Sequence, residues 1–172
     1  MRKPDCVIEI FLRPGELYFG DHYTRIRTVL GSCVSLVFWH PTRLLGGMCH
    51  YMLPGRASRH PAQPLDGRYG DEAIELTLAE IRAAGAHPRE FRVRVFGGAD
   101  MFPGIKKREP VMIGRKNVEA ARQMIEAHQL HCSAAHVEGT GHRNLLFDVW
   151  NGRVTMKMAA AGLEGEADQE AA

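Results

Sequence analysis

The sequence lacks the features that mark several classes of protein. No apolar run approaches the roughly 20 residues that a helix needs to cross a bilayer. The net charge is only +2 with histidines neutral, and the arginines are scattered along the chain instead of forming one stripe. Such a chain has no electrostatic footprint for nucleic acid or an anionic membrane. We therefore expect neither membrane insertion nor nucleic-acid binding.

A secretion signal is not expected either. Arg2 and Lys3 begin the chain as they would begin a signal peptide, but Glu9, Arg13 and Pro14 interrupt the apolar stretch that follows. No small-residue cleavage site comes after it. We therefore expect a cytoplasmic protein, in which the 4 cysteines are reduced thiols and form no disulfide framework.

Motifs for metals and common cofactors are absent too. The chain has 4 cysteines and 9 histidines but no C-x-x-C and no H-x-x-x-H spacing. Neighbours such as Cys49 and His50 would point to opposite faces of a strand, so a zinc site is not expected. There is no G-x-S-x-G motif, and the glycines at 97–98 lack the G-x-G-x-x-G spacing of a dinucleotide loop.

What is present is the composition of an ordinary globular domain. The length of 172 residues is enough for one domain with a real core. Of these residues, 45% are hydrophobic and 24% charged, the balance of an ordinary globular protein. Many strand patterns and only two good helix patterns favour an α+β fold over a doubly wound parallel sheet. We expect a single domain over residues 1–158, followed by a small, acidic and disordered tail over 159–172.

The expected elements follow from periodicity and turn signals. Helices are expected at about 71–84, where Ile74, Leu78 and Ile81 define one apolar face, and at about 115–128. Residues 54–68 have no periodicity and are expected to form an exposed, mobile loop. The expected strands are 7–12, 17–19, 24–30, 33–39, 44–53, 92–96, 132–137, 145–150 and 154–158, with a hairpin turn at Asn151-Gly152 before the last.

One cysteine lies where a nucleophile could act. Cys33 follows Gly31 and Ser32 at the junction of a tight turn and a buried strand. A thiol becomes a useful nucleophile when its pKa is lowered or a base removes its proton, and histidine is the usual base. If the strands before and after the His40-Pro41 turn pair, His50 lies at the same end of the sheet as Cys33. Inert packing is the alternative for a lone cysteine.

Seven segments carry a resemblance to a known family. The segments L-G-S-C-V and G-G-M-C-H-Y-M-L-P are together specific, although each alone would be weak. With them, the chain resembles the CheD family, the chemoreceptor glutamine deamidases of bacterial chemotaxis. In chain order the segments are 14–16, 28–34, 46–54, 68–71, 95–101, 113–117 and 139–140 with Arg143.

The resemblance implies a fold, an activity and partners. The fold is a layered α/β sandwich of mixed, largely antiparallel sheet with two main helices, like that of certain deamidating toxins. The activity is hydrolysis of selected receptor glutamines to glutamate and ammonia, without a cofactor. The partners are the cytoplasmic helical domains of chemoreceptors and a CheC-type phosphatase. A non-catalytic adaptor for that phosphatase is an alternative function, and a cysteine protease or transferase is another.

Carried over by position, the resemblance also implies a catalytic set. Cys33 matches the family nucleophile and His50 the family base. A threonine completes the set, and Thr28 is the candidate, although the register could also select Arg27. Thr28 would orient the imidazole as the third member of a triad does.

Further residues are candidates for the oxyanion and the substrate. Backbone N–H groups around Gly31, Ser32 and Cys33 are expected to stabilise the oxyanion, because a tight glycine turn leaves them unpaired. Gly97 and Gly98 would allow close approach of a substrate helix, and ordinary turn chemistry is the alternative for these glycines.

Two positions depart from the family pattern. Glu138 and His142 stand where glycine is expected, which would alter a loop near the site or the surface that meets a partner.

Overall fold

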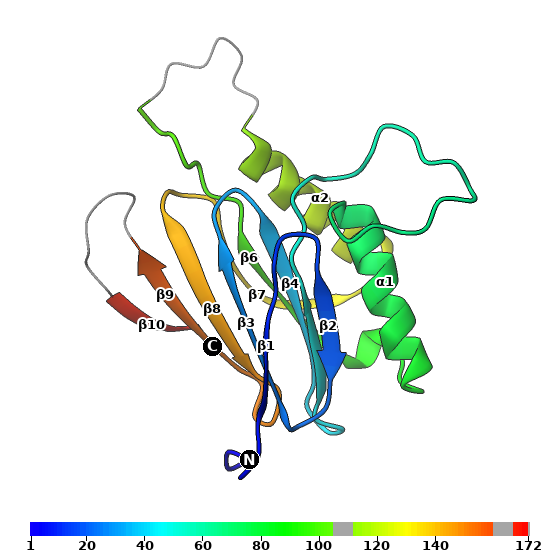
Figure 1. Cartoon of the computed structure of the whole chain (residues 1–172), viewed down its shortest axis with the longest axis vertical. Helices are drawn as coiled ribbons and strands as arrows, with labels where there is room; N and C mark the ends of the chain where they lie inside the picture. The colour runs from blue at the N-terminus through cyan, green and yellow to red at the C-terminus, as the bar shows by residue number, and fades with distance from the viewer. Residues whose placement is uncertain (105–111, 160–166, 172) are drawn as a thin grey trace.

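Two five-stranded sheets stacked face to face, with helices on one side, make up the fold. The computed structural model describes residues 1–104, 112–159 and 167–171. Both main helices lie against the same sheet, so the layers run helices, middle sheet, outer sheet (Figure 1). The expected α+β sandwich is confirmed.

The outer sheet is mostly antiparallel. Its order is β1-β3-β8-β9-β10, and β1 pairs with β3 in parallel. Its strands are β1 (Ile8–Phe11), β3 (Thr24–Leu30), β8 (His142–Asp148), β9 (Arg153–Ala159) and β10 (Ala167–Ala171).

The middle sheet has the same mixture of pairings. Its order is β2-β5-β4-β6-β7, and β6 pairs with β7 in parallel. Its strands are β2 (Leu17–Gly20), β5 (Leu45–Cys49), β4 (Val34–His40), β6 (Arg92–Gly97) and β7 (His131–Val137). The helices that cover it are α1 (Gly70–Ala83) and α2 (Ile113–Ala127), and a short 3-10 turn, η1 (Pro88–Glu90), precedes β6.

The central strand β4 is buried on both faces, which explains its nearly continuous apolar sequence. Val34, Leu36 and Phe38 belong to the core between the middle sheet and the helices. Val37 belongs to the second core, between the two sheets, and Cys33 packs against that core. Period-2 alternation therefore places Cys33 on the face that looks toward the outer sheet.

The first helix forms as its apolar spacing predicts. Ile74, Leu78 and Ile81 are all at most 1% exposed and pack into the core beneath the helices. Burying such a side chain contributes about 1.5–3 kcal/mol. The helix is followed by Gly85, whose φ of +67° suits a left-handed residue after a helix end.

The fifth strand is shorter than expected. The sequence predicts a strand over 44–53, but β5 ends at Cys49 and only one further bridge, between Val34 and Tyr51, continues the ladder. His50 keeps the register of the strand, because the pairs Val37–Met48 and Val34–Tyr51 belong to one alignment. Its own N–H and C=O bond Glu16 and Gly15 on the side of β2. The pairing with β4 stops after Tyr51, where the N–H groups of Met52 and Leu53 bond the carbonyl of Arg68.

The loop over 54–68 is anchored at two positions by one buried carboxylate. Glu72, in the first turn of α1, is 5% exposed. Both of its oxygens accept hydrogen bonds from Arg56 at 2.5 Å, and one also accepts from the backbone N–H of Asp66 at 2.8 Å. Charge-assisted, two-pronged contacts of this kind fix geometry strongly. The mobility expected for this loop stays a prediction for the stretch between the two anchor points.

The C-terminal tail differs in part from expectation. Residues 160–166 and 172 lie outside the described residues, but β10 (Ala167–Ala171) pairs antiparallel with β9, in place of the expected disorder. Backbone groups along the edge of β9 can bond a strand of weak intrinsic propensity, so pairing overrides composition here. The domain limit at residue 158 stays a prediction.

Candidate active site

The turn that carries Cys33 is held by the loop after β6. The carbonyl of Cys33 accepts a hydrogen bond from the N–H of Gly98 at 2.8 Å, and the carbonyl of Gly31 accepts one from Ala99 at 3.0 Å. Gly97 has φ +113°, and a Cβ there would lie 2.2 Å from the Cys33 carbonyl oxygen. Only glycine permits this contact, so the two glycines support from behind the turn of the candidate nucleophile Cys33, called the nucleophile turn below.

This packing changes the expected roles of the glycines. The N–H of Gly98 is already bonded to Cys33, so it is not free to serve as an oxyanion donor. Gly31 packs under Met101, whose sulfur would be 2.9 Å from a Cβ at that position. Within the described part of the chain, no backbone carbonyl accepts a hydrogen bond from the N–H of Ser32 or of Cys33. These two N–H groups are the remaining oxyanion candidates.

The strand register brings Cys33 and His50 to one face of the middle sheet. Val34 and Tyr51 exchange two backbone hydrogen bonds, of 3.1 and 3.0 Å. Cys33 and His50 each precede a member of this pair, so both point away from the helices, toward the outer sheet. They are diagonal neighbours across the strand pair, a relation with Cβ atoms up to about 7 Å apart. The thiol is partly exposed and is not in a disulfide.

A threonine of the opposite sheet holds the imidazole. Thr28 Oγ1 of β3 lies 2.7 Å from Nδ1 of His50, and both side chains are buried. The same hydroxyl donates to the carbonyl of Leu12 at 2.9 Å. The neighbouring Arg27 is half-exposed and bonds Glu9 instead. The structure therefore places Thr28, and not Arg27, beside the imidazole.

This pair of contacts fixes the tautomer of His50. A hydroxyl has one proton, and a carbonyl oxygen can only accept, so the Thr28 proton is committed to Leu12. Thr28 must then accept from His50, which places the ring proton on Nδ1 and a lone pair on Nε2. Nε2 is buried and has no hydrogen-bond partner among the described residues. His50 thus has an available basic nitrogen in a site of low polarity.

Burial keeps both groups of the Cys/His pair neutral at rest. Desolvation lowers the pKa of His50 to about 4, against a smaller opposing effect of the Glu16 carboxylate. Desolvation also raises the pKa of the Cys33 thiol, which its own backbone N–H lowers slightly. At neutral pH the pair is therefore thiol and imidazole, and not thiolate and imidazolium. Such a pair suits general-base activation of the thiol during attack.

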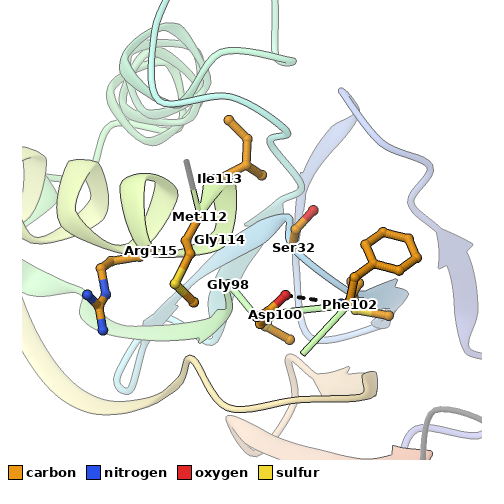
Figure 2. A pocket seen from close by; sticks show the side chains of 10 residues that line it. Ser32, Gly98, Asp100, Phe102, Met112, Ile113, Gly114 and Arg115 are labelled. Carbon is orange, nitrogen blue, oxygen red and sulfur yellow. Dashed lines mark hydrogen bonds between the residues drawn. The ribbon is translucent and has the colours of Figure 1, made fainter. Parts of the chain in front are cut away.

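A pocket of about 280 Å³ opens beside the nucleophile turn. Figure 2 shows Ser32 on one side of it, with the start of α2 and the segment after β6 as the other walls. The backbone N–H of Phe102 donates to Oδ1 of Asp100 at 3.0 Å, which shapes that segment. The lining is mostly apolar, with two charges; it consists of Ser32, Gly98, Ala99, Asp100, Met101, Phe102, Met112, Ile113, Gly114 and Arg115.

Two kinds of feature are not found in the part of the chain that the structure describes. No group of three or more His, Cys, Asp or Glu side chains that could hold a metal ion gathers there. Among the described helices, none has the length and apolar character that crossing a membrane requires.

Comparison with known proteins identifies the family. The family model for CheD, described as CheD chemotactic sensory transduction, matches residues 52–158. A protein named "Probable chemoreceptor glutamine deamidase CheD", from Pseudomonas fluorescens (strain SBW25), is 47% identical over 164 residues, which cover 95% of this chain and 92% of that protein. The chain belongs to the CheD family.

Other CheD proteins are similarly close. The one from Pseudomonas savastanoi pv. phaseolicola is 50% identical over 91% of this chain and 88% of its own length. That named CheD 3, from Dechloromonas aromatica, is 48% identical over 88% of each. A solved structure, Bacillus licheniformis hypothetical protein YfiH, has a TM-score of 0.43 and 14% identity over 72% of this chain and 49% of that one. That similarity is too weak to carry an argument.

The matched regions differ in whether they contain the site. The CheD family model begins at residue 52, after Thr28, Cys33 and His50. The alignment with the Pseudomonas fluorescens CheD protein covers 95% of the chain, so it has to include residues 28–50.

Three contributors to the site have no signal in residue type and spacing. They are the Leu12 carbonyl, which fixes the hydroxyl of Thr28; Glu16, which bonds and electrostatically influences His50; and Asn117, which contacts the nucleophile turn. Glu16 and Asn117 lie in segments that carry the CheD resemblance, and that resemblance is the only sequence signal that could have found them. Leu12 acts through its backbone, which no side-chain pattern reveals.

The two departures from the CheD pattern differ in backbone conformation. Glu138 has φ +64°, a left-handed conformation in which glycine is preferred. Its carbonyl accepts a hydrogen bond from Arg143 at 2.5 Å, and its N–H donates to Gly97 at 2.8 Å. His142 lies in β8 and is not among the residues with positive φ. The expectation of glycine has a structural basis at 138 and none at 142.

The conformation of Glu138 generates a stability prediction. Glu138→Gly should raise the free energy of unfolding by about 1 kcal/mol, because a left-handed non-glycine residue is strained by about that amount. The lost ion pair with Arg122, at 3.7 Å on the surface, contributes little. Urea unfolding measures the change. His142→Gly is the matched control and should destabilise, since glycine weakens a strand; equal signs for the two variants would contradict this account.

The buried imidazole predicts a pH-dependent stability. The pKa of His50 is about 4 in the folded protein and about 6.5 in the unfolded chain. Between these values only the unfolded chain binds the proton, so the free energy of unfolding falls as pH falls from about 6.5 to about 4, by up to roughly 3 kcal/mol.

Urea unfolding at pH 7 and pH 4.5 tests this, with His50→Asn as the reference. The wild type should lose about 2–3 kcal/mol more between the two pH values than the variant does. All other titrating groups are common to the two proteins and cancel in the difference. An equal loss in both proteins would show that His50 is not a buried neutral group.

Proposed function

We propose that this chain is a protein-glutamine deamidase that hydrolyses glutamine side chains of chemoreceptors to glutamate and ammonia. The observation that carries the proposal is the arrangement around His50: Nδ1 is held by Thr28, Nε2 keeps its lone pair, and Cys33 lies on the same face of the sheet. The names of the CheD relatives supply the substrate class.

The first half of the reaction forms a thioester. Nε2 of His50 takes the proton of the Cys33 thiol as the sulfur attacks the glutamine carbonyl carbon. The oxyanion that develops is stabilised by the N–H groups of Ser32 and Cys33. The carbon–nitrogen bond then breaks, His50 returns the proton to the leaving nitrogen, and ammonia departs.

The second half regenerates the enzyme. His50 removes a proton from a water molecule, which attacks the thioester carbonyl. The carbon–sulfur bond breaks, Cys33 recovers its proton and the side chain leaves as glutamate. Throughout, Nδ1 keeps its proton and donates to Thr28, so the ring holds its orientation when Nε2 becomes protonated.

The surroundings suit a substrate side chain presented by another protein. The pocket beside Ser32 is open, and Phe102 on its wall is 61% exposed. The proposed partners are the helical cytoplasmic domains of chemoreceptors, with a CheC-type phosphatase as a further partner, and the proposed location is the cytoplasm. Each reaction adds a negative charge to the receptor, which changes its electrostatics directly.

Replacement of the nucleophile tests the proposal. Cys33→Ala should abolish the one-dalton mass gain of receptor peptides and the release of ammonia, with a loss of at least about 10³-fold, because no other thiol can form the thioester. Mass spectrometry of receptor fragments incubated with purified protein measures it. Cys132→Ala, which removes an exposed thiol on β7, is the control and should remain active.

The outcomes of that experiment separate the alternatives. Equal mass gains with wild type and Cys33→Ala would refute the enzyme proposal. No gain with either protein, together with binding to receptor or phosphatase, would favour the adaptor. Cleaved receptor peptides would indicate a protease.

The role of Thr28 gives an independent prediction. Thr28→Val keeps the shape but removes the hydroxyl, so the imidazole loses the partner that fixes its tautomer; kcat/KM should fall about 10- to 100-fold. Thr28→Ser should keep most of the activity. Thr24→Val is the matched control, because Thr24 is equally buried on the same face of β3. If Thr28→Val and Thr24→Val are equally active, Thr28 does not orient the base.

A further inference from the structure

One fully buried side-chain amide bridges the two segments that carry the Cys/His pair. Asn117 in α2 has no exposed surface. Its Nδ2 donates to the carbonyl of Ser32 at 3.0 Å and to the carbonyl of Met52 at 2.8 Å. Ser32 directly precedes the nucleophile, and Met52 lies two residues beyond His50.

The Asn117 bridge supplies two hydrogen-bond donors, which the two strand segments lack at this point. The carbonyls of Ser32 and Met52 are both acceptors, so they cannot bond each other. A carboxamide has two N–H donors on one nitrogen, which matches two converging carbonyls. This orientation leaves the amide oxygen unpaired: Oδ1 of Asn117 is buried without a hydrogen-bond partner among the described residues. The side chain is therefore oriented by its donors.

Asn117 is itself held firmly in place. Its backbone carbonyl accepts a hydrogen bond from the hydroxyl of Tyr51 at 2.7 Å. One turn earlier, Gly114 packs so tightly on the loop after β6 that a Cβ there would be 2.4 Å from the Gly98 carbonyl oxygen. Gly98 in turn bonds the carbonyl of Cys33. The helix and the nucleophile turn thus share one rigid set of contacts.

Few other backbone contacts connect the two segments at this end of the sheet. β4 begins at Val34 and β5 ends at Cys49, and beyond them the described hydrogen bonds between the segments are those of the Val34–Tyr51 pair. Cys33 lies outside that pair on one side and His50 on the other. A rotation about the pair would change the distance from thiol to imidazole, and the Asn117 bridge opposes it.

We propose that Asn117 is a positioning residue that sets the separation and orientation of the Cys33 thiol relative to His50. The inference rests on the proposed deamidase function. A misplacement of the order of 1 Å between reacting groups can reduce a rate by about 10²-fold. Because Asn117 does not line the pocket beside Ser32, its loss should act on kcat and leave KM nearly unchanged.

Two variants and one matched control test the proposal kinetically. Asn117→Asp keeps the shape but presents a carboxylate to two carbonyls, and Asn117→Ala removes the bridge. Both should lower kcat for receptor deamidation by about 10²-fold, with KM within about threefold. Trp39→Phe removes a hydrogen bond to the carbonyl of Val149 at the other end of β4 and leaves the carbonyls of Ser32 and Met52 bonded to Asn117. It should lower the melting temperature and keep kcat within about twofold of wild type.

A second readout does not depend on the receptor. Iodoacetamide alkylation of Cys33 is followed against pH by peptide mass spectrometry, with the exposed Cys132 of the same molecule as internal reference. If Asn117 keeps His50 in reach of the thiol, both variants should slow Cys33 alkylation near neutral pH by about tenfold. The rates should converge with wild type where the thiol ionises unaided. General loosening of the fold would instead speed alkylation of this partly buried thiol.

The outcomes are decisive either way. Wild-type kcat in both variants overturns the proposal. A loss of activity that merely follows the melting temperature as in Trp39→Phe, a failure of both variants to fold, or faster Cys33 alkylation overturns it as well. A Cys33→Ala protein that still deamidates the receptor would refute the proposed function instead, and the alkylation profile would still decide whether Asn117 positions the thiol against His50.

Discussion

The single proton of the Thr28 hydroxyl is the constraint on which the site depends. It is committed to the Leu12 carbonyl, so Thr28 can only accept from His50. The hydrogen bond from Thr28 to Leu12 therefore determines which imidazole nitrogen is basic and on which side of the ring it lies. It also requires both sheets, because Thr28 belongs to the outer sheet and His50 follows a strand of the middle sheet. The imidazole of His50 is therefore oriented only when the two sheets are packed together.

The other half of the site depends on the helical layer. The nucleophile turn is supported from behind by the Gly97-Gly98 loop, which packs against the first turn of α2, and Asn117 of the same helix bonds the turn directly. All three layers thus meet at Cys33 and His50: the outer sheet orients the imidazole, the middle sheet sets the register, and the helices hold the turn. Loosening any layer would disturb the geometry of the pair.

Much of the fold could be predicted from the sequence, because the signals for its strands and helices lie within short segments of the chain. The alternation over 24–30 and the apolar spacing of Ile74, Leu78 and Ile81 predicted β3 and the buried face of α1, because each pattern has one period and a clear stop. The end of β5 could not be predicted, since residues 50–53 are strand-like in composition and only the distant Arg68, which accepts from the N–H groups of Met52 and Leu53, ends their pairing with β4.

The residues of the site also fall into two groups, those that could be predicted from the sequence and those that could not. Cys33 and His50 could be named from residue type and strand pairing, and Thr28 from the family resemblance. The engaged N–H of Gly98 and the bridge made by Asn117 depend on contacts between residues far apart in the chain. Such contacts have no periodicity to reveal them. β10 differs for another reason: pairing along an edge depends on the backbone, to which composition is a poor guide.

The electrostatics of the pair constrain the order of events in the proposed reaction. Burial lowers the pKa of His50 to about 4 and raises that of the Cys33 thiol, so transfer of the proton before attack is strongly unfavourable in the free protein. The proton must therefore move as the carbon–sulfur bond forms, when negative charge passes from sulfur to the carbonyl oxygen. At that moment the charge lies near the N–H groups of Ser32 and Cys33 and no longer on a desolvated sulfur. With a pair that is neutral at rest, the N–H groups around the oxyanion stabilise a charge that exists in the transition state and not in the free enzyme.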